Sequence, residues 1–349
     1  MTDFAAWRAG FAARHPALAA YLPADLAPLP EVAAQAAAQA EFTLSAARYI
    51  ARAMPAARIA DGRAAFARHR ALLTRLRAET GVPGEIICAI WGVETDFGRI
   101  RGDLPVLAAL ATLAHGAPRR AYFETELIAA LALIAAGRAA PGLTGSWAGA
   151  SGHCQFMPSA VQKFARTSDR TPLDIWSDDP TGGLTAIVLY LSAHGWQAGA
   201  SWLTETAPDH PETLLIPAGL PGPAFRTGPN FQVLLSYNRA TLYALAVGLL
   251  AHAIAGRPIP ETWPDRPALS RAELRELQAI LTANGHDTRG TDGLIGPDTR
   301  AAIRAWQKAH NLPADGFASR ALLLHLSENT PGVRGLAPGP RSKPGQAPD

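Results

Sequence analysis

One glutamate stands near the end of an apolar stretch at residues 81–98, which has the sequence GVPGEIICAIWGVETDFG. Pro83 suits a first helical turn, Gly98 suits a helix end, and the residues between are apolar nearly all round, so the pattern predicts a buried helix. Glu94 lies near its C-terminal end, where burial and the helix dipole both raise the pKa of a carboxyl group. Glu85 and Asp96 point to other sides, so the helix offers one candidate general acid. A capping or ion-paired acid is the alternative.

A second stretch, residues 143–159 with the sequence LTGSWAGASGHCQFMPS, mixes glycine with polar and aromatic side chains. Glycine lets the backbone approach a ligand closely, and amide, hydroxyl and ring groups suit recognition of a sugar, although a tight interhelical loop also explains the pattern. Ser146 is not in a GxSxG elbow, which disfavours a serine nucleophile. His153 could act as a base, but a lone histidine in a glycine-rich loop is more often structural. The ten histidines contain no HExxH cluster, so we expect no metal.

Length and composition limit the number of domains and the class of protein. The 349 residues suggest two domains, and 48% hydrophobic with 17% charged residues excludes a wholly disordered chain. A net charge of +3 is too weak to argue for nucleic acid, and we expect no such partner. Cys88 and Cys154 exclude a disulfide scaffold and lack CxxC spacing. The N-terminal sequence shows no signal peptide, so the chain is cytoplasmic or already trimmed.

Stretches rich in alanine, leucine and arginine predict a mostly α fold, with helices at 119–136, 181–194 and 239–255. The sequence RPIPETWPDRP at 257–267 carries four prolines and cannot continue a helix, so it predicts a linker. These features divide the chain into a large domain at 1–256, the linker, a small domain at 268–328 and a tail at 329–349. The tail is rich in proline and glycine, and we expect it to be disordered.

The small domain carries clear local signals. Ser270 and Glu273 form a candidate capping box for a helix that ends before Gly285, and a second helix is expected at 299–309. Asp-Gly pairs at 292–293 and 315–316 predict turns in which glycine supplies a positive φ and aspartate caps.

Four motifs in order resemble the membrane-bound lytic murein transglycosylase B family: the run from IWGVETDFGRIRGDLP, then GSWAGASGHCQFMPS, then LYLSAHGW, then SYNRATLYALAVGLLAHAI. The resemblance covers roughly residues 6–255. Residues 268–326 resemble the three-helix peptidoglycan-binding domain that often follows this catalytic domain. The resemblance implies a lysozyme-like transglycosylase fold, which cleaves the β-1,4 bond between N-acetylmuramic acid and N-acetylglucosamine without water and leaves a 1,6-anhydro end.

The resemblance also implies roles for individual residues. Glu94 matches the catalytic glutamate, which protonates the glycosidic oxygen and then takes the proton of the C6 hydroxyl, while the substrate's acetamido group stabilises C1. No second carboxylate is required, unlike in most glycosidases. The implied substrate-binding residues are Ser146, Gln155, Tyr237, Asn238, Trp147, Phe156, Arg119 and Arg120. Core packing explains Trp147 and Phe156 equally well, and the two arginines could equally be solvated.

Some features depart from the family pattern. Ser151 stands where the family usually has methionine, and Cys154 precedes Gln155. In the region of the calcium loop known from one branch, only Asp169 and Asp174 remain, and their spacing does not fit the ligand pattern. We therefore expect no metal and no cofactor.

The remaining expectations concern partners and place of action. We expect a monomer that binds peptidoglycan glycan strands in the periplasm, with peripheral or lipid-anchored membrane association left open. A muramidase that hydrolyses the same bond is one alternative, and a non-catalytic peptidoglycan-binding scaffold is the other.

Overall fold

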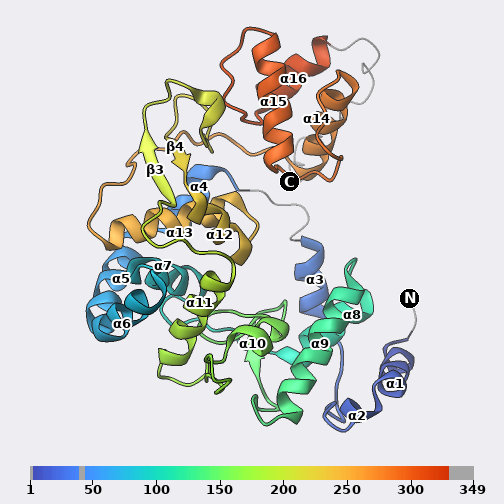
Figure 1. The fold of residues 1–349 in the computed structure, drawn as a ribbon. Helices are drawn as coiled ribbons and strands as arrows, with labels where there is room; N and C mark the ends of the chain where they lie inside the picture. Colours follow the sequence, from blue (N-terminus) through green and yellow to red (C-terminus); the bar gives the residue numbers. More distant parts are fainter. Residues whose placement is uncertain (1–2, 39–43, 330–349) are drawn as a thin grey trace, which may run out of the picture. The chain divides into compact units, whose positions relative to one another are not determined.

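The computed structural model describes residues 3–38 and 44–329. Helices dominate these residues, and the strands form only two small two-stranded sheets (Figure 1). The predicted mostly α fold is therefore confirmed. The strands are β1 (Leu104–Pro105), β2 (Thr144–Gly145), β3 (Leu203–Thr206) and β4 (Ala224–Thr227), and β1 pairs with β2 in antiparallel fashion.

The chain divides into two compact units. The first contains the described residues of 1–40, 49–205 and 226–261, and the second those of 41–48, 206–225 and 262–349. This division differs from the continuous ranges expected from the sequence, because two segments of the expected large domain group with the C-terminal helices. The predicted disordered tail at 329–349 lies outside the described residues, apart from Asn329, which ends the last helix.

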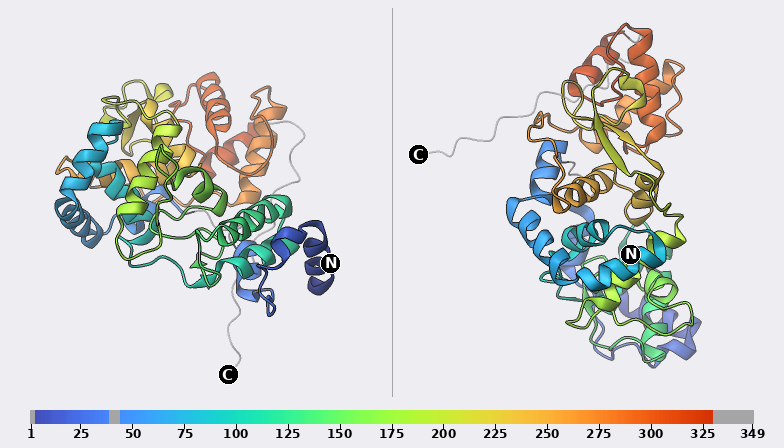
Figure 2. Two further views of the ribbon diagram at one scale, coloured as in Figure 1. Left: turned by 60° about the horizontal axis from the view of Figure 1, so that its bottom comes forward. Right: turned by 60° about the vertical axis from the view of Figure 1, so that its left-hand side comes forward.

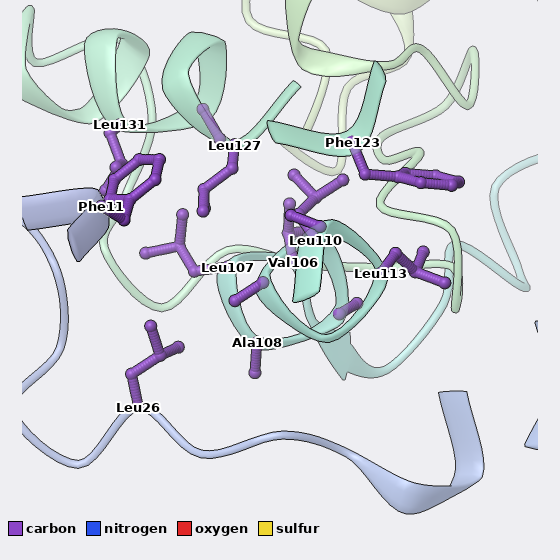
Figure 3. Close-up of a cluster of buried hydrophobic side chains, with 14 of the residues drawn as sticks. Phe11, Leu26, Val106, Leu107, Ala108, Leu110, Leu113, Phe123, Leu127 and Leu131 are labelled. Carbon is purple, nitrogen blue, oxygen red and sulfur yellow. The ribbon is translucent and has the colours of Figure 1, made fainter. Parts of the chain in front are cut away.

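The helices of the first unit surround two cores. They are α1 (Phe4–Arg14), α2 (Pro16–Ala19), α3 (Pro30–Ala38), α4 (Ala46–Ala53, of which the part from Tyr49 on belongs to this unit), α5 (Ala56–Arg68), α6 (Arg70–Thr80), α7 (Gly84–Thr95), α8 (Val106–Gly116), α9 (Arg120–Ala135), α10 (Pro158–Phe164), α11 (Thr181–Ala193), α12 (Pro229–Tyr237) and α13 (Thr241–Ile254). One core joins α8 and α9, and on one side of it Leu107, Leu127 and Leu131 lie near Phe11 of α1 (Figure 3). The other surrounds α7, against which α5, α6, α11 and α13 pack.

Helix α7 confirms the prediction of a buried apolar helix but ends earlier than expected. Pro83 is the N-cap, and Thr95 is the last helical residue. The chain then leaves the helix through two residues with left-handed backbone, Asp96 at φ 50° and Phe97 at φ 60°, before Gly98. The predicted stop at Gly98 is therefore wrong, because an aspartate, which tolerates this conformation, already ends the helix.

Among its described residues, the second unit contains three whole α-helices, α14 (Arg271–Ala283), α15 (Pro297–Ala309) and α16 (Arg320–Asn329), which form a compact group in both views of Figure 2. The predicted capping box is present, since the Ser270 hydroxyl accepts from the Glu273 amide and the Glu273 carboxylate accepts from the Ser270 amide. The apolar faces of the three helices meet around Trp306, which is 2% exposed.

Two buried glutamines hold the Asp-Gly turns of this unit in the same way. Gln278 Nε2 donates to Asp292 Oδ1 while its Oε1 accepts from the Gly293 amide, and Gln307 repeats the pattern with Asp315 and the following glycine. Both glycines have positive φ, as predicted. Each turn therefore depends on one side-chain amide that supplies both a donor and an acceptor.

The segment 206–225, which includes a short 3₁₀ turn at Pro211–Thr213, belongs to this unit through specific contacts. The Leu220 amide donates to Asp315 Oδ2 at 3.1 Å, and Arg266 donates to the Leu220 carbonyl at 2.6 Å. Phe225 stacks on Trp263 with ring centroids 5.9 Å apart. The composition of the proline-rich linker gave no sign of these contacts.

Within the described residues, no single helix has the length and apolar character needed to cross a bilayer. One bent pair, α12 with α13, reaches that length and apolar character only when the two helices are taken together.

Candidate active site

Glu94 occupies the last turn of α7 and is partly exposed, while the protein around its carboxyl group excludes most water. The Tyr243 hydroxyl of α13 donates to Glu94 Oε1 at 2.6 Å. Burial raises the pKa of Glu94 to about 7, although the hydrogen bond from Tyr243 acts in the opposite direction. A carboxyl group that titrates near neutral pH can both give and take a proton, which is what one residue serving as acid and then base requires.

Three tyrosines surround this carboxyl group. Tyr243 is 3% exposed, and its ring stacks parallel to that of Tyr237, with 6.3 Å between centroids and 10° between planes. Burial raises the pKa of Tyr49, Tyr237 and Tyr243, and the nearby charge of Glu94 raises each further. All three therefore stay protonated at neutral pH, so they can act only as neutral hydrogen-bonding groups beside Glu94. Tyr49 and Tyr243 were not predicted as site residues from the sequence.

Asp96 is the nearest acid along the chain, and the structure excludes it as a second proton-transfer group. Its two carboxylate oxygens accept from Arg58 Nε at 3.1 Å and from Arg99 Nη2 at 2.7 Å. Burial alone would raise the pKa of Asp96, but the hydrogen bonds from Arg99 and Arg58 outweigh it and lower the pKa. Asp96 is therefore a fixed anion, as the one-carboxylate reading of this helix requires.

His153 is structural. It is 3% exposed, its Nδ1 accepts from the Trp91 indole at 3.1 Å, and its Nε2 lies 2.9 Å from the Ser177 carbonyl. Because the indole can only donate, the histidine proton belongs on Nε2, where it donates to Ser177. Burial lowers the pKa of His153, so the ring is neutral. With its acceptor nitrogen already occupied, it cannot serve as a general base.

The glycine-rich loop brings Ser146 and Gln155 into fixed positions. Gln155 adopts φ 48°, and its Nε2 donates to the Arg101 carbonyl at 3.0 Å and the Gly152 carbonyl at 3.1 Å. The Ser146 hydroxyl accepts from the Ala150 amide at 3.1 Å. Within the described residues neither side chain forms a hydrogen bond with Glu94, so their expected bonds to the acid and the sugar stay predictions.

Tyr237 and Asn238 follow each other at the end of α12, but they do different things. The Tyr237 hydroxyl donates to the Cys154 carbonyl at 2.6 Å and so ties the glycine-rich loop to α12. Asn238 is exposed, and its Oδ1 accepts from the Ala240 amide at 3.0 Å, which shapes the turn into α13. The structure thus brings Tyr237 beside Glu94 and Tyr243, whereas a direct role for Asn238 stays a prediction.

The two aromatic residues predicted to line a groove differ from that expectation. Phe156 is 3% exposed and packs against Phe164, Tyr190 and Tyr237, so the structure favours core packing over groove lining. Trp147 is partly buried against the core of α8 and α9, which also favours the packing account. Both were predicted to line a groove from their residue type, and an aromatic side chain suits a groove and a core equally well.

Arg119 and Arg120 are exposed at the start of α9. The Arg119 guanidinium lies over the rings of Tyr122 and Phe123, 5.2 and 5.6 Å from their centroids. This stacking leaves the edge of the guanidinium available to an anion while limiting its motion. Among the described residues neither arginine takes part in an ion pair, so both can still meet a carboxylate of the substrate.

In the described part of the chain, no group of three or more histidine, cysteine, aspartate or glutamate side chains is arranged to hold a metal ion. The carboxylates of Asp169 and Asp174 accept local hydrogen bonds, the first from the Thr167 hydroxyl and the Thr171 amide and the second from the amides of residues 176 and 177.

Comparison with known proteins identifies families that match both parts of the chain. Residues 10–213 and 203–252 match the family described as Transglycosylase SLT domain, and residues 270–326 match the family described as Putative peptidoglycan binding domain. Membrane-bound lytic murein transglycosylase B of Escherichia coli strain K12 is 35% identical over 210 residues, a match that spans 50% of this chain and 58% of that relative.

Solved structures are similar over a greater length. SltB3 from Pseudomonas aeruginosa, in complex with NAG-NAM-pentapeptide, is 34% identical with a TM-score of 0.83, and the match covers 93% of this chain and 100% of that chain. Soluble lytic transglycosylase SltB1 from the same organism is 30% identical with a TM-score of 0.63, over 72% of this chain and 98% of that chain. The similarity to SltB3 therefore includes residues of both units.

Proposed function

This chain belongs to the transglycosylase SLT domain family, and we propose that it is a lytic transglycosylase that cleaves the β-1,4 bond between N-acetylmuramic acid and N-acetylglucosamine in peptidoglycan. The observation that carries the proposal is Glu94, a carboxyl group whose pKa is raised to about 7 and which is bonded to Tyr243 alone among the described side chains. SltB3, whose match covers 93% of this chain, was solved in complex with NAG-NAM-pentapeptide.

The first step uses the protonated form of Glu94. Because the Tyr243 hydroxyl donates to Oε1, the acidic proton resides on Oε2. Glu94 gives this proton to the glycosidic oxygen as the bond between that oxygen and C1 of N-acetylmuramic acid breaks. The positive charge that develops at C1 is stabilised by the oxygen of the substrate's own 2-acetamido group, so no protein nucleophile takes part.

The second step uses the ionised form. The C6 hydroxyl of the same sugar attacks C1, the bond from C1 to the acetamido oxygen breaks, and Glu94 takes the hydroxyl proton. The product is a 1,6-anhydro end, and Glu94 returns to its starting state. Tyr243 stabilises the carboxylate between the two steps, which a hydroxyl donor bonded to it can do without changing its own charge.

The second unit supplies binding rather than chemistry. Its three helices match a peptidoglycan-binding family, and binding there would raise the local concentration of Glu94 on its polymer. Because its proposed substrate is peptidoglycan, we propose that the enzyme acts in the periplasm as a monomer. Arg119 and Arg120 would meet the carboxylates of the peptide stems.

Two other functions would use parts of the same chain. A muramidase would use the same fold and the same acid with water in place of the C6 hydroxyl, and its product would be heavier by one water. A non-catalytic scaffold would keep the binding unit and lose the acid. The environment of Glu94 disfavours the scaffold, because a raised pKa and a dedicated tyrosine donor serve no evident purpose in binding.

The experiment compares Glu94→Gln with Glu85→Gln, the same substitution on the same helix, where Glu85 points to another side. We expect release of soluble muropeptides from purified sacculi to fall by about 100-fold or more in the first variant and to stay within about two-fold in the second, since loss of a general acid removes about 100- to 10,000-fold in rate. Equal rates for Glu94→Gln and the unaltered enzyme would refute the catalytic assignment.

A further inference from the structure

Arg58 lies in the first turn of α5 and contacts two other elements of the site at once. Its Nε donates to Asp96 Oδ1 at 3.1 Å, and its Nη1 donates to the carbonyls of Ala53 at 2.8 Å and Arg52 at 3.3 Å. The side chain is 18% exposed. One guanidinium therefore joins the residue that ends α7 to the last residues of α4.

Each of these elements carries a group beside the acid. Asp96 follows Glu94 by two residues, and its left-handed backbone determines where the chain leaves α7. Ala53 ends α4, which carries Tyr49 at the edge of the same site. Holding Asp96 and Ala53 on one side chain thus fixes the distance between the end of the acid's helix and the helix that carries Tyr49.

Local helix energetics do not account for an arginine at this place. A cation in the first turn of α5 opposes the positive end of that helix's dipole. The same cation is favourable at the C-terminal end of α4, where carbonyl groups lack intrahelical partners, and beside the Asp96 carboxylate. The stabilising contacts of Arg58 therefore come from its neighbours and not from its own helix.

Lysine cannot make this set of bonds. The guanidinium presents Nε–H and Nη1–H in fixed directions on a plane, which lets one group face the carboxylate while another faces the carbonyls. An ammonium group is a single point of charge on a flexible stem. The substitution Arg58→Lys therefore keeps the charge and removes the geometry.

We propose that Arg58 is a positioning residue, which keeps water away from Glu94 by fastening the end of α4 to the end of α7. The role rests on the proposed function of Glu94 as acid and base. The titratable groups that face Glu94 are Tyr49 of α4, Tyr237 of α12, Tyr243 of α13 and Cys154 of the glycine-rich loop. All are neutral at pH 7, so burial decides how Glu94 titrates, and burial is what Arg58 controls.

The test measures the titration of Glu94 itself in the full chain. Glutamate labelled with ¹³C at the carboxyl carbon gives an NMR signal for Glu94, assigned by its loss in Glu94→Gln. We expect Arg58→Lys to lower the pKa from about 7 to about 6 or below, because the loosened α4 admits water to the carboxyl group. Arg68→Lys, an exposed arginine on the same helix, should leave the titration unchanged.

Activity gives the second readout. Arg58→Lys should lower kcat by about 10-fold or more and change KM by less than about three-fold, with the fall in rate at high pH beginning at a lower pH. Asp96→Asn should have a similar effect, and the double variant should lose little more than either single variant. Circular dichroism establishes that each variant is folded, and only folded variants are compared.

The outcomes separate this proposal from the proposed function. A folded Arg58→Lys variant in which Glu94 still titrates near 7 and kcat stays within two-fold would overturn the positioning role. If the titration moves in Arg58→Lys while Glu94→Gln retains full activity, the positioning of the carboxyl group stands and the catalytic assignment of Glu94 fails. Fully additive losses in the double variant would also contradict the proposed link between Arg58 and Asp96.

Discussion

The hydrogen bond between Tyr243 and Glu94 offers the sharpest perturbation of the site, through Tyr243→Phe. The substitution removes one oxygen from a side chain that is 3% exposed and leaves the ring that stacks on Tyr237. The packing of α13 against α7 should therefore survive. What is lost is the donor to Glu94 Oε1 at 2.6 Å.

The size of the effect follows from the charge of the acceptor. A hydrogen bond to a charged group contributes about 1.5–3 kcal/mol, and one pKa unit corresponds to about 1.36 kcal/mol. Loss of the donor destabilises the carboxylate more than the carboxylic acid, so the pKa of Glu94 should rise by about one to two units above its present value of about 7. The ionised fraction at pH 7 then falls to about a tenth or less.

The assay is the pH dependence of the initial rate on soluble glycan fragments. A general acid must be protonated in the free enzyme, so kcat/KM should fall as pH rises through the pKa of Glu94. In Tyr243→Phe this fall should begin about one to two pH units higher. The maximal rate should drop by about 10-fold, because the ionised base of the second step loses its donor.

Tyr21→Phe is the matched control, since Tyr21 is 39% exposed and lies outside the site. It should leave the profile unchanged. If the upper limb of the Tyr243→Phe profile stays in place or moves to lower pH, then either the hydroxyl does not donate to Glu94 or Glu94 is not the group that titrates.

Three further predictions concern stability. Folding raises the pKa of Glu94 from 4.5 to about 7, so ionisation of this group destabilises the folded chain as pH rises through this range. In urea unfolding, Glu94→Gln should therefore be more stable than the unaltered chain by about 3 kcal/mol at pH 8, with no such gain at pH 4. Gly102→Ala should cost about 2–5 kcal/mol, because φ is 86° and the added Cβ would lie 2.2 Å from the Gly145 carbonyl carbon. Gln307→Ala should lower the thermal stability of the second unit by about 2–4 kcal/mol, since Asp315 loses a buried donor.

A control measurement or control variant accompanies each of the three stability predictions. A stability gain in Glu94→Gln that is equal at both pH values would show that its carboxyl group has an ordinary pKa. Gly116→Ala, where a Cβ meets nothing within 4 Å, should change stability by less than about 0.5 kcal/mol, and an equal cost in both glycine variants would refute the steric argument. Lys308→Ala, exposed on the same helix as Gln307, should be near neutral, and a neutral Gln307→Ala would contradict the role of the buried amide.

Local patterns in the sequence predicted much of this molecule. The apolar run around Glu94 indicated a buried helix, the Ser270 and Glu273 pair indicated a capping box, and the motif order indicated the family, each because neighbouring residues alone determine the signal. The stop of α7 was misplaced because Asp96 takes the left-handed conformation expected of Gly98.

Contacts between distant segments were beyond such patterns. Tyr243 lies 149 residues from Glu94, and Arg58 lies 38 residues from Asp96, so no spacing rule joins them. The same holds for the segment 206–225, whose bonds to Asp315 and Arg266 form only when the second unit folds. Residue type alone also left the role of Phe156 undecided, because a phenylalanine suits both a sugar-binding surface and a hydrophobic core. Its burial in the structure favours the core.

Digestion of sacculi in H₂¹⁸O tests whether Glu94 cleaves the glycan without water. Mass spectrometry of the released muropeptides should show 1,6-anhydro ends, lighter than the hydrolysed form by one water and free of ¹⁸O at C1, and Glu94→Gln should release almost none. Reducing ends that carry ¹⁸O at C1 as the main product would refute cleavage without water and identify the enzyme as a muramidase.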